Sequence, residues 1–226
     1  MKLVFAGLDN PITLDPGKCA VLEVENSALF TRLAISLESG RELDALEPYS
    51  LWEGCERIKH KDALMTISDP LNLPWDDKSF MTAAIRKIER EFLEDEDLRQ
   101  EIESAQIALQ QRLQVFSMGF HTEVGFGLEW DLKRYLKFLG FGVAPNEDAS
   151  FLDNLLNFLS FALDAGCKKT LTFVNLKTFL TDKELQAFYE HVFFSNIPVL
   201  LLENKTDSAY HEHERKTVID LDFLEH

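Results

Sequence analysis

The sequence predicts an α/β fold with a mainly parallel sheet, and the segment from residue 168 to residue 203 gives the main reasons. Residues 171–174 (LTFV) and 199–202 (VLLL) are apolar at consecutive positions, as in strands covered on both faces. Between them, Thr181 and Glu184 have the spacing of a capping box, and apolar residues follow at helical intervals. Asn175 and Glu203 end the strands, where open α/β sheets usually bind ligands. This unit is typical of a nucleotide-hydrolase-like core.

The first residues of the chain predict three short strands. Residues 3–6, 12–14 and 20–24 are separated by the turn sequences DNP and DPG, so we expect a small β-meander. Gly17 and Lys18 resemble the end of a phosphate-binding loop. However, Ile12 stands where that loop needs its first glycine, and Cys19 replaces the hydroxyl residue that binds magnesium. The sequence therefore predicts a turn here and no bound nucleotide.

A helix and another strand follow. Ser27 can cap a helix that runs to about residue 37, and Gly40 can end it. Residues 41–61 are charged and are expected to be irregular, whereas residues 63–67 (ALMTI) predict a strand. Two prolines in the sequence SDPLNLPW then mark a boundary.

Residues 79–118 contain neither Gly nor Pro and carry apolar side chains at helical spacing. They predict two long helices, or one helix broken at the sequence LEDED (93–97). The charged outer faces are typical of solvation. The long apolar stripe needs cover, which another helix or another subunit must supply.

Alternation marks residues 123–131 (EVGFGLEWD), in which apolar side chains fall on one face. Glu123, Glu129 and Asp131 share the other face. They could bind calcium, which takes roughly six to eight oxygen ligands, or they could face water.

Short elements complete the chain. Residues 132–139 predict a helix with basic side chains on its outer side, residues 141–144 a brief strand, and residues 218–221 a last strand. Ser150 can cap a very apolar helix that should lie against the sheet. The histidines in HEHE (211–214) suggest a metal cluster at first sight, but no third His or Cys is near, so a solvated loop is favoured.

The composition favours a soluble, cytoplasmic protein that does not act as a simple basic nucleic-acid binder. The 226 residues, 46% of them hydrophobic, allow one large domain or a domain with a sizeable insertion. A net charge of -16 means that any DNA site has to be local. The 3 cysteines indicate neither disulfides nor zinc, and no apolar stretch approaches the ~20 residues of a membrane span.

Catalytic motifs are absent from the sequence, which has no G-x-S-x-G, no H-E-x-x-H and no supported Cys/His pair. Pairs of acidic residues are expected by chance among 39 of them. Without a phosphate loop or a nucleophile, a binding or scaffolding role is favoured.

Several short blocks point to a known family. They are FVN at 173–175, FLT at 179–181, VLLLE at 199–203, LDNPI at 8–12, LMTISD at 64–69 and FLG at 138–140. In these blocks and in the order of its elements, the chain resembles the short form of the Csn family, the type II-A CRISPR-associated adaptation proteins.

The resemblance implies a degenerate nucleotide-hydrolase-like head, residues 1–78 and 141–226, with an inserted helical leg, residues 79–140. It also implies a ring-shaped homotetramer that threads double-stranded DNA ends through a positively lined hole. Such proteins assist spacer acquisition in antiviral defence, alongside other CRISPR adaptation proteins, and have no known catalytic activity of their own.

Calcium binding is in doubt because the chain departs from the family here. The family's acidic segment matches residues 122–127, where Glu123 keeps the first carboxylate but Gly125 and Gly127 replace the others. Glu129 and Asp131 follow the matched block and could compensate only by geometry.

Candidate DNA-binding residues come from local basic clusters, because no family motif fixes them. They are Lys59, Lys61, Lys133, Arg134, Lys137, Lys168 and Lys169, and they would contact phosphates without reading bases. Two alternatives stay open. One is a metal-dependent phosphohydrolase or nuclease using Glu123, Glu129 and Asp131, and the other is a structural partner of adaptation proteins without DNA affinity.

Overall fold

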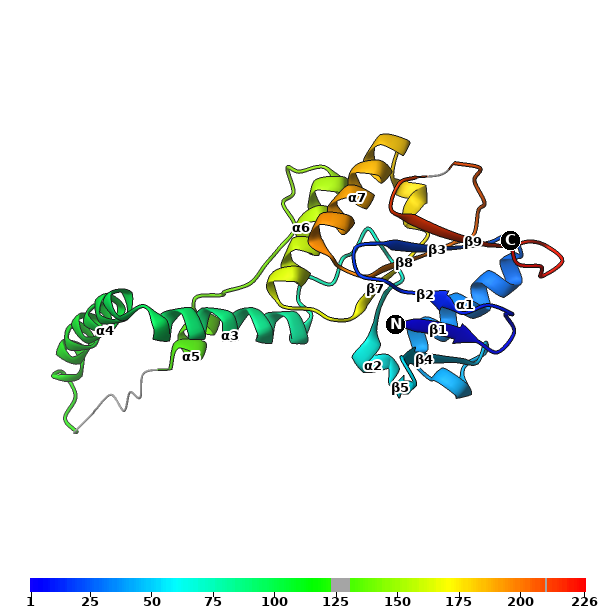
Figure 1. Ribbon diagram of the computed structural model, residues 1–226. Helices are drawn as coiled ribbons and strands as arrows, with labels where there is room; N and C mark the ends of the chain where they lie inside the picture. The colour runs from blue at the N-terminus through cyan, green and yellow to red at the C-terminus, as the bar shows by residue number, and fades with distance from the viewer. Residues whose placement is uncertain (123–130, 210) are drawn as a thin grey trace. The chain divides into compact units, whose positions relative to one another are not determined.

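The computed structural model describes residues 1–122, 131–209 and 211–226. The chain forms two compact units, shown in Figure 1, and each is described by itself. Unit 1 consists of Met1–Trp75 and Pro145–His226, and unit 2 of Asp76–Ala144. In the described ranges, no helix combines the length and the apolar character needed to cross a bilayer.

A parallel sheet of five strands forms the centre of unit 1. In spatial order its strands are β6 (Leu64–Ile67), β7 (Thr170–Val174), β8 (Val199–Glu203), β3 (Cys19–Val24) and β9 (Glu214–Ile219). Every residue of β3, β7 and β8 is buried, as their consecutive apolar residues predict. The predicted α/β fold with a mainly parallel sheet is therefore confirmed.

Helices cover both faces of this sheet (Figure 1). On one face lie α6 (Phe151–Asp164) and α7 (Asp182–Ser195), and α1 (Ser27–Ser39) lies on the other. The predicted caps at Ser150 and Thr181 are both confirmed as capping boxes. The cap of α1 is Asn26 rather than the predicted Ser27, because the Asn26 side chain accepts hydrogen bonds from the first free N–H groups.

An antiparallel sheet packs on the α1 side, and the sequence predicted only half of it. Its strands, in spatial order, are β2 (Ile12–Thr13), β1 (Lys2–Phe5), β4 (Tyr49–Glu53) and β5 (Glu56–Ile58). The predicted β-meander is confirmed for its first two strands, since β1 pairs antiparallel with β2, and wrong for the third, because β3 leaves this sheet and joins the parallel one. The prediction that residues 41–61 are irregular is also wrong. Besides β4 and β5, they contain the short helix η1 (Glu42–Asp44) and the start of α2 (His60–Ala63).

The missed strand β4 has a physical explanation. Its buried residues Tyr49 and Leu51 alternate with half-buried ones, and the two join Leu3, Leu22 and Leu33 in the core between the sheets. Such a short strand needs only a few apolar residues. Among the many charged residues of this segment, two apolar positions are too few to reveal the alternation of a strand.

Two predictions near the carboxyl end also need correction. Residues 141–144 form no strand. The last strand begins at Glu214 rather than at residue 218, and it pairs with β3 through Ala20↔Arg215 and Val21↔Lys216. The charged residues at the start of β9 are tolerated because they are paired: Lys216 lies 2.6 Å from Asp207, and Arg215 lies 3.1 Å from Asp15.

Unit 2 contains α3 (Lys78–Glu94), α4 (Glu96–Ser117) and α5 (Leu132–Phe138). The prediction of two long helices is confirmed, with the break at Asp95, which ends α3 and caps α4 through Leu98 N. No residue of α4 is buried. The alternating segment lies outside the described residues, apart from Asp131.

Candidate functional site

The loop between β3 and α1, the position at which many α/β proteins bind phosphate, cannot do so in this chain. Only Glu25 and Asn26 separate β3 from α1. The Asn26 Oδ1 atom accepts hydrogen bonds from Ala28 N at 3.1 Å and from Leu29 N at 3.0 Å. Those N–H groups are the ones that a helix start offers to an anion. The connection is thus too short for a phosphate loop, and its donors are occupied.

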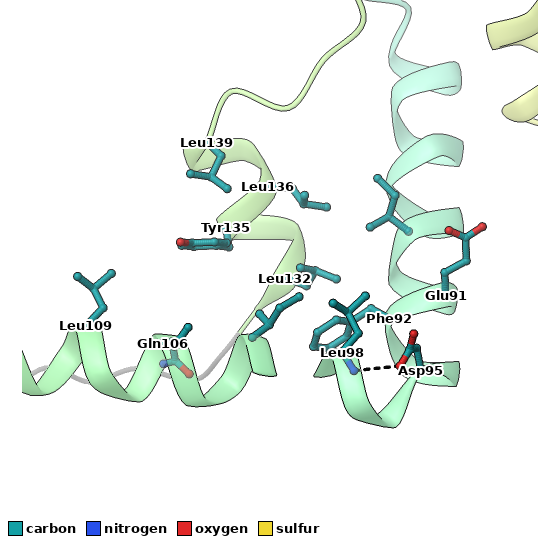
Figure 2. Close-up of a pocket in the computed structure, with 13 residues that line it drawn as sticks. Glu91, Phe92, Asp95, Leu98, Gln106, Leu109, Leu132, Tyr135, Leu136 and Leu139 are labelled. Carbon is teal, nitrogen blue, oxygen red and sulfur yellow. Dashed lines mark hydrogen bonds between the residues drawn. The ribbon is translucent and has the colours of Figure 1, made fainter. Parts of the chain in front are cut away.

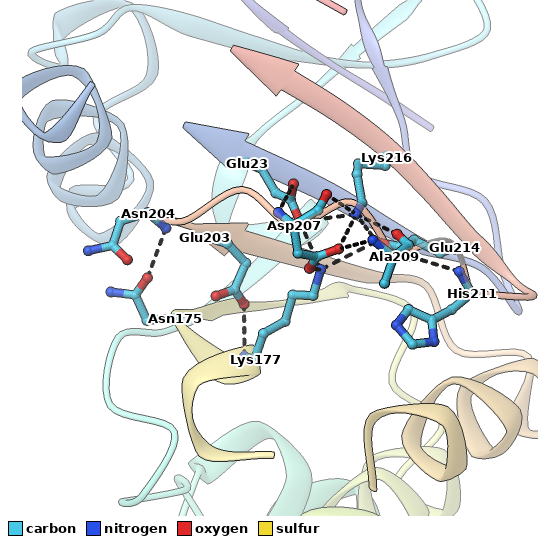
Figure 3. Close-up of polar contacts among 10 residues, drawn as sticks. All are labelled: Glu23, Asn175, Lys177, Glu203, Asn204, Asp207, Ala209, His211, Glu214 and Lys216. Carbon is cyan, nitrogen blue, oxygen red and sulfur yellow. Dashed lines mark hydrogen bonds and ion pairs between the residues drawn. The ribbon is translucent and has the colours of Figure 1, made fainter. Parts of the chain in front are cut away.

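An ion-pair network fills the space beside β3 and β9 (Figure 3). It consists of Glu23, Lys177, Asp207, Glu214 and Lys216. The Lys177 Nζ atom lies 2.8 Å from Glu23 Oε1 and contacts Asp207, while the Lys216 Nζ atom lies 2.6 Å from Asp207 Oδ1 and 3.4 Å from Glu23 Oε1. Glu214 Oε1 lies 3.5 Å from the Lys177 ammonium. Three carboxylates thus surround two ammonium groups, so both positive charges of this network are neutralised within it.

Hydrogen bonds fix this network to the segment that follows β8. The Asp207 N–H donates to Glu23 Oε2 at 3.2 Å, and the Lys216 ammonium donates to the carbonyl of Ala209 at 2.8 Å. Although burial opposes it, hydrogen bonds from Lys177 and Lys216 hold the pKa of Asp207 well below its usual range. The charged groups of the network therefore bind one another and the backbone, in the place where a nucleotide hydrolase would bind its ligand.

Glu203 and Asn175, which the sequence marked as candidate ligand-binding residues, also have internal partners. The Lys177 N–H donates to Glu203 Oε1 at 3.0 Å, and Asn204 N–H donates to Asn175 Oδ1 at 3.0 Å. Burial raises the pKa of Glu203 to about 7, against the lowering effect of Lys177. At the carboxyl edge of the sheet, these two side chains therefore serve to hold the protein's own backbone.

The opposite, amino edge of the sheet gathers two of the predicted basic clusters. Strands β6 and β7 begin side by side with Leu64 opposite Thr170. Lys59 and Lys61 belong to the α2 region just before β6, and Lys168 and Lys169 precede β7. Parallel strands start at the same edge, so the structure brings these lysines together although about a hundred residues separate the pairs.

The α2 turn is held in place by His60, which lies between the first two lysines. His60 Nδ1 lies 2.6 Å from the Tyr49 hydroxyl, and the His60 N–H donates to Glu42 Oε1 at 2.9 Å. Burial lowers the pKa of His60, Glu42 opposes that effect, and the nearby Lys169 ammonium lowers it further.

A fifth lysine at this edge was not among the predicted residues. Lys18 directly precedes β3, which β8 separates from β7. From the sequence, Lys18 was considered only as the end of a phosphate-binding loop, and that interpretation was rejected. Its position directly before a strand of the parallel sheet was therefore overlooked. Within the described part of the chain, none of the five amino-edge lysines pairs with a carboxylate; Lys169 is half-buried and the other four are exposed.

The third basic cluster lies on α5 in unit 2. Lys133, Arg134 and Lys137 are all exposed. Arg134 Nε lies 3.2 Å from Asp131 Oδ2, so one of these three charges is already paired. The structure does not place α5 relative to the amino edge of unit 1.

The calcium prediction remains untested. Glu123 and Glu129 lie outside the described residues. Asp131 Oδ1 accepts the Arg134 N–H at 3.0 Å and thereby caps α5, while Oδ2 pairs with the Arg134 side chain. Each oxygen has one partner and keeps a lone pair that could still bind a cation. Among the residues outside the two gaps, no three His, Cys, Asp or Glu side chains gather as metal ligands.

An apolar groove of about 700 Å³ opens between α3, α4 and α5 within unit 2. Figure 2 shows Phe92, Leu98, Leu132 and Leu136 pointing into it. Its lining continues onto Leu109, which is half exposed at 49%. The groove is the apolar stripe predicted from the sequence, and the described residues of one chain leave it open.

Comparison with known proteins places the chain in a family. Residues 51–223 match the Cas_Csn2 family, described as CRISPR-associated protein. No curated protein matches the chain. Among solved structures, a putative ABC transporter (ATP-binding protein) from Pyrococcus furiosus is similar at 10% identity over 96% of this chain and 97% of that one. Its TM-score is 0.39, which is too low to establish a shared site. Because the family match spans most of the sequence, this chain belongs to the Cas_Csn2 family of CRISPR-associated proteins, as its sequence blocks predict.

Proposed function

We propose that this protein is a non-catalytic, cytoplasmic, sequence-independent binder of double-stranded DNA ends that assists CRISPR spacer acquisition. The observation that carries the proposal is the distribution of lysines in unit 1. The carboxyl edge of the sheet, where a nucleotide hydrolase would bind phosphate, is filled by its own ion pairs. The amino edge presents five lysines without carboxylate partners among the described residues, whereas at the carboxyl edge the exposed lysines are Lys183 and Lys205.

Recognition on this surface would go to the phosphates. The amino-edge lysines are separate point charges on loops and a short helix, without the extended basic helix that reads base edges in a major groove. Binding to phosphates in this way releases counterions, so the affinity should fall steeply as salt rises. A chain with a net charge of -16 needs such a local surface to bind DNA at all.

Self-assembly into a ring-shaped homotetramer is supported by unit 2. Helix α4 is 22 residues long and none of its residues is buried, although it carries Leu109, Leu113 and Phe116. An apolar helix face without cover is costly in water, and a second copy of the chain would bury it. Unit 1 would then act as the head domain and unit 2 as the leg.

A mobility-shift assay tests the proposal. We expect retardation of a blunt linear duplex at low salt, with and without calcium, and no stable capture of a covalently closed circle. The double variant Lys168→Glu, Lys169→Glu should weaken binding. It should also flatten the salt dependence by about 0.9 in log–log slope for each DNA phosphate that the variant no longer neutralises.

Lys183→Glu is the matched control. Lys183 is exposed in the first turn of α7, at the carboxyl edge of the sheet, so the charge change is of the same kind but the surface is different. If the wild-type protein fails to retard the linear duplex, or if Lys183→Glu weakens binding as much as the Lys168 and Lys169 changes do, the proposal is wrong.

A further inference from the structure

Two aromatic side chains stand at the amino edge of the parallel sheet, at the end of α7. Phe194 is 81% exposed and Phe193 is 45% exposed. Their rings meet edge to face, with centroids 5.4 Å apart. Apart from this contact with Phe193, most of the Phe194 ring faces solvent and is open to a ligand.

The backbone around these rings is firmly held. The Phe193 ring stacks on His213, with centroids 4.0 Å apart and planes 13° from parallel, and the His213 carbonyl accepts the Cys19 N–H at 3.0 Å. Gly17 has a positive φ of 72°, and a Cβ added there would come within 3.3 Å of the Phe193 carbonyl. The turn before β3, the end of α7 and the start of β9 are therefore packed together.

The turn that packs against the end of α7 also carries a cation. Lys18 follows Gly17 directly and is exposed, with no carboxylate partner in the described ranges. Asp15, the acidic residue of the same turn, pairs with Arg215 at 3.1 Å. The surface thus combines a free aromatic face with a free ammonium group, which is the combination that binds single-stranded nucleic acid through stacked bases and paired phosphates.

We propose that Phe194 stacks on an unpaired nucleobase at the end of a DNA strand, while Lys18 binds a phosphate of the same strand. The inference rests on the proposed function and deepens it, because it defines which end structure the protein prefers. Inside a duplex both faces of each base are already stacked, and the terminal base pair of a blunt end exposes one face of two joined bases, whereas an overhanging or frayed base can offer a face of its own. One phenyl ring covers one base, which fits an unpaired nucleotide better than a terminal base pair.

The test compares blunt duplexes with duplexes that carry a short 5′ or 3′ overhang, using fluorescence anisotropy at fixed salt. We expect the wild-type protein to bind at least one overhang about tenfold more tightly than the blunt end. Phe194→Ala should remove this preference and leave blunt-end affinity unchanged, and Phe194→Tyr should keep it. Phe223→Ala is the control, since Phe223 is also exposed, at 52%, but follows the carboxyl end of β9.

A second measurement keeps the inference separate from the proposed function. A 2-aminopurine base at the overhang, or in a single-stranded oligonucleotide, should lose fluorescence on binding to the wild type and not on binding to Phe194→Ala. If blunt duplexes do not bind but the quenching occurs, only the proposed function fails. If blunt duplexes bind but neither preference nor quenching depends on Phe194, the inference is wrong. A changed solution mass of Phe194→Ala would also overturn it, since Phe194 would then contact a second copy.

Discussion

Replacing Glu203 by glutamine is expected to stabilise the protein above pH 7. The Glu203 side chain ends the central strand β8 and is 3% exposed. Burial raises the pKa of Glu203 to about 7, the hydrogen bond and charge of Lys177 oppose this effect, and the charge of Glu23 adds to it. Glutamine keeps an oxygen that can accept the Lys177 N–H at the same place, but it cannot ionise.

The magnitude follows from the difference between the ordinary glutamate pKa of 4.5 and the value of about 7. At about 1.4 kcal/mol per pKa unit, ionising buried Glu203 costs about 3 kcal/mol. The folded state binds this proton more tightly than the unfolded state. The stabilising contribution of the protonated form is therefore complete below pH 4.5 and is lost as the pH rises through 7.

Urea unfolding between pH 5 and pH 8, at one fixed protein concentration, measures the effect. The difference in free energy of unfolding between Glu203→Gln and the wild type should grow with pH to about 3 kcal/mol. Glu184→Gln is a control of opposite sign, because hydrogen bonds from the backbone and side chain of Thr181 lower the pKa of Glu184. A difference for Glu203→Gln that is independent of pH, or that is destabilising at pH 8, would refute the reasoning.

Three further changes have definite expected outcomes. Lys177→Met should lower the free energy of unfolding by about 3 kcal/mol, because the Lys216 ammonium is then the one cation left, among the described residues, for Glu23, Asp207 and Glu214, two of which are buried. Lys183→Met should have little effect, and equal urea midpoints for Lys177→Met and the wild type would show that Lys216 alone suffices. Asp131→Ala should cost about 1 kcal/mol because α5 then has no side-chain cap, with or without calcium. A destabilisation seen only with calcium would instead identify Asp131 as a ligand. Phe116→Asp should reduce the solution mass measured by light scattering, and an unchanged mass would show that α4 does not mediate assembly.

The sequence predicted the central strands of the parallel sheet because apolar residues dominate them. Strands β7 and β8 are buried on both faces, so most of their residues are apolar, with Thr172 and the terminal Glu203 among the exceptions. The two capping boxes were equally readable, since Ser150 and Thr181 act through local hydrogen bonds. The apolar strands and the capping boxes can both be recognised within one short segment, whichever other elements that segment packs against.

Strands β4 and β5 of the antiparallel sheet, and the start of β9, were missed because they depend on tertiary partners. Strand β4 is stabilised by pairing with β1 and by the core between the sheets, and only Tyr49 and Leu51 of its residues are buried. Strand β9 carries Glu214, Arg215 and Lys216, whose charges normally argue against a strand. In the folded protein two of those side chains join the ion-pair network, and that compensation is invisible in one segment of sequence.

The same dependence on tertiary partners explains why the sequence indicated basic residues but not which of them are paired with carboxylates in the fold. Lys177 follows β7 and Lys168 precedes it, and composition treats them alike. The first is neutralised because the chain turns back over the carboxyl edge and brings Asp207 to it. The second lies at the opposite edge, where no carboxylate among the described residues pairs with it. A rule follows for parallel sheets that have lost their phosphate loop: basic residues placed directly before strands gather on one edge, whatever their separation in the chain. Applied to this sequence, that rule also selects Lys18. The search for local basic clusters omitted it because no other basic residue lies next to it in the sequence.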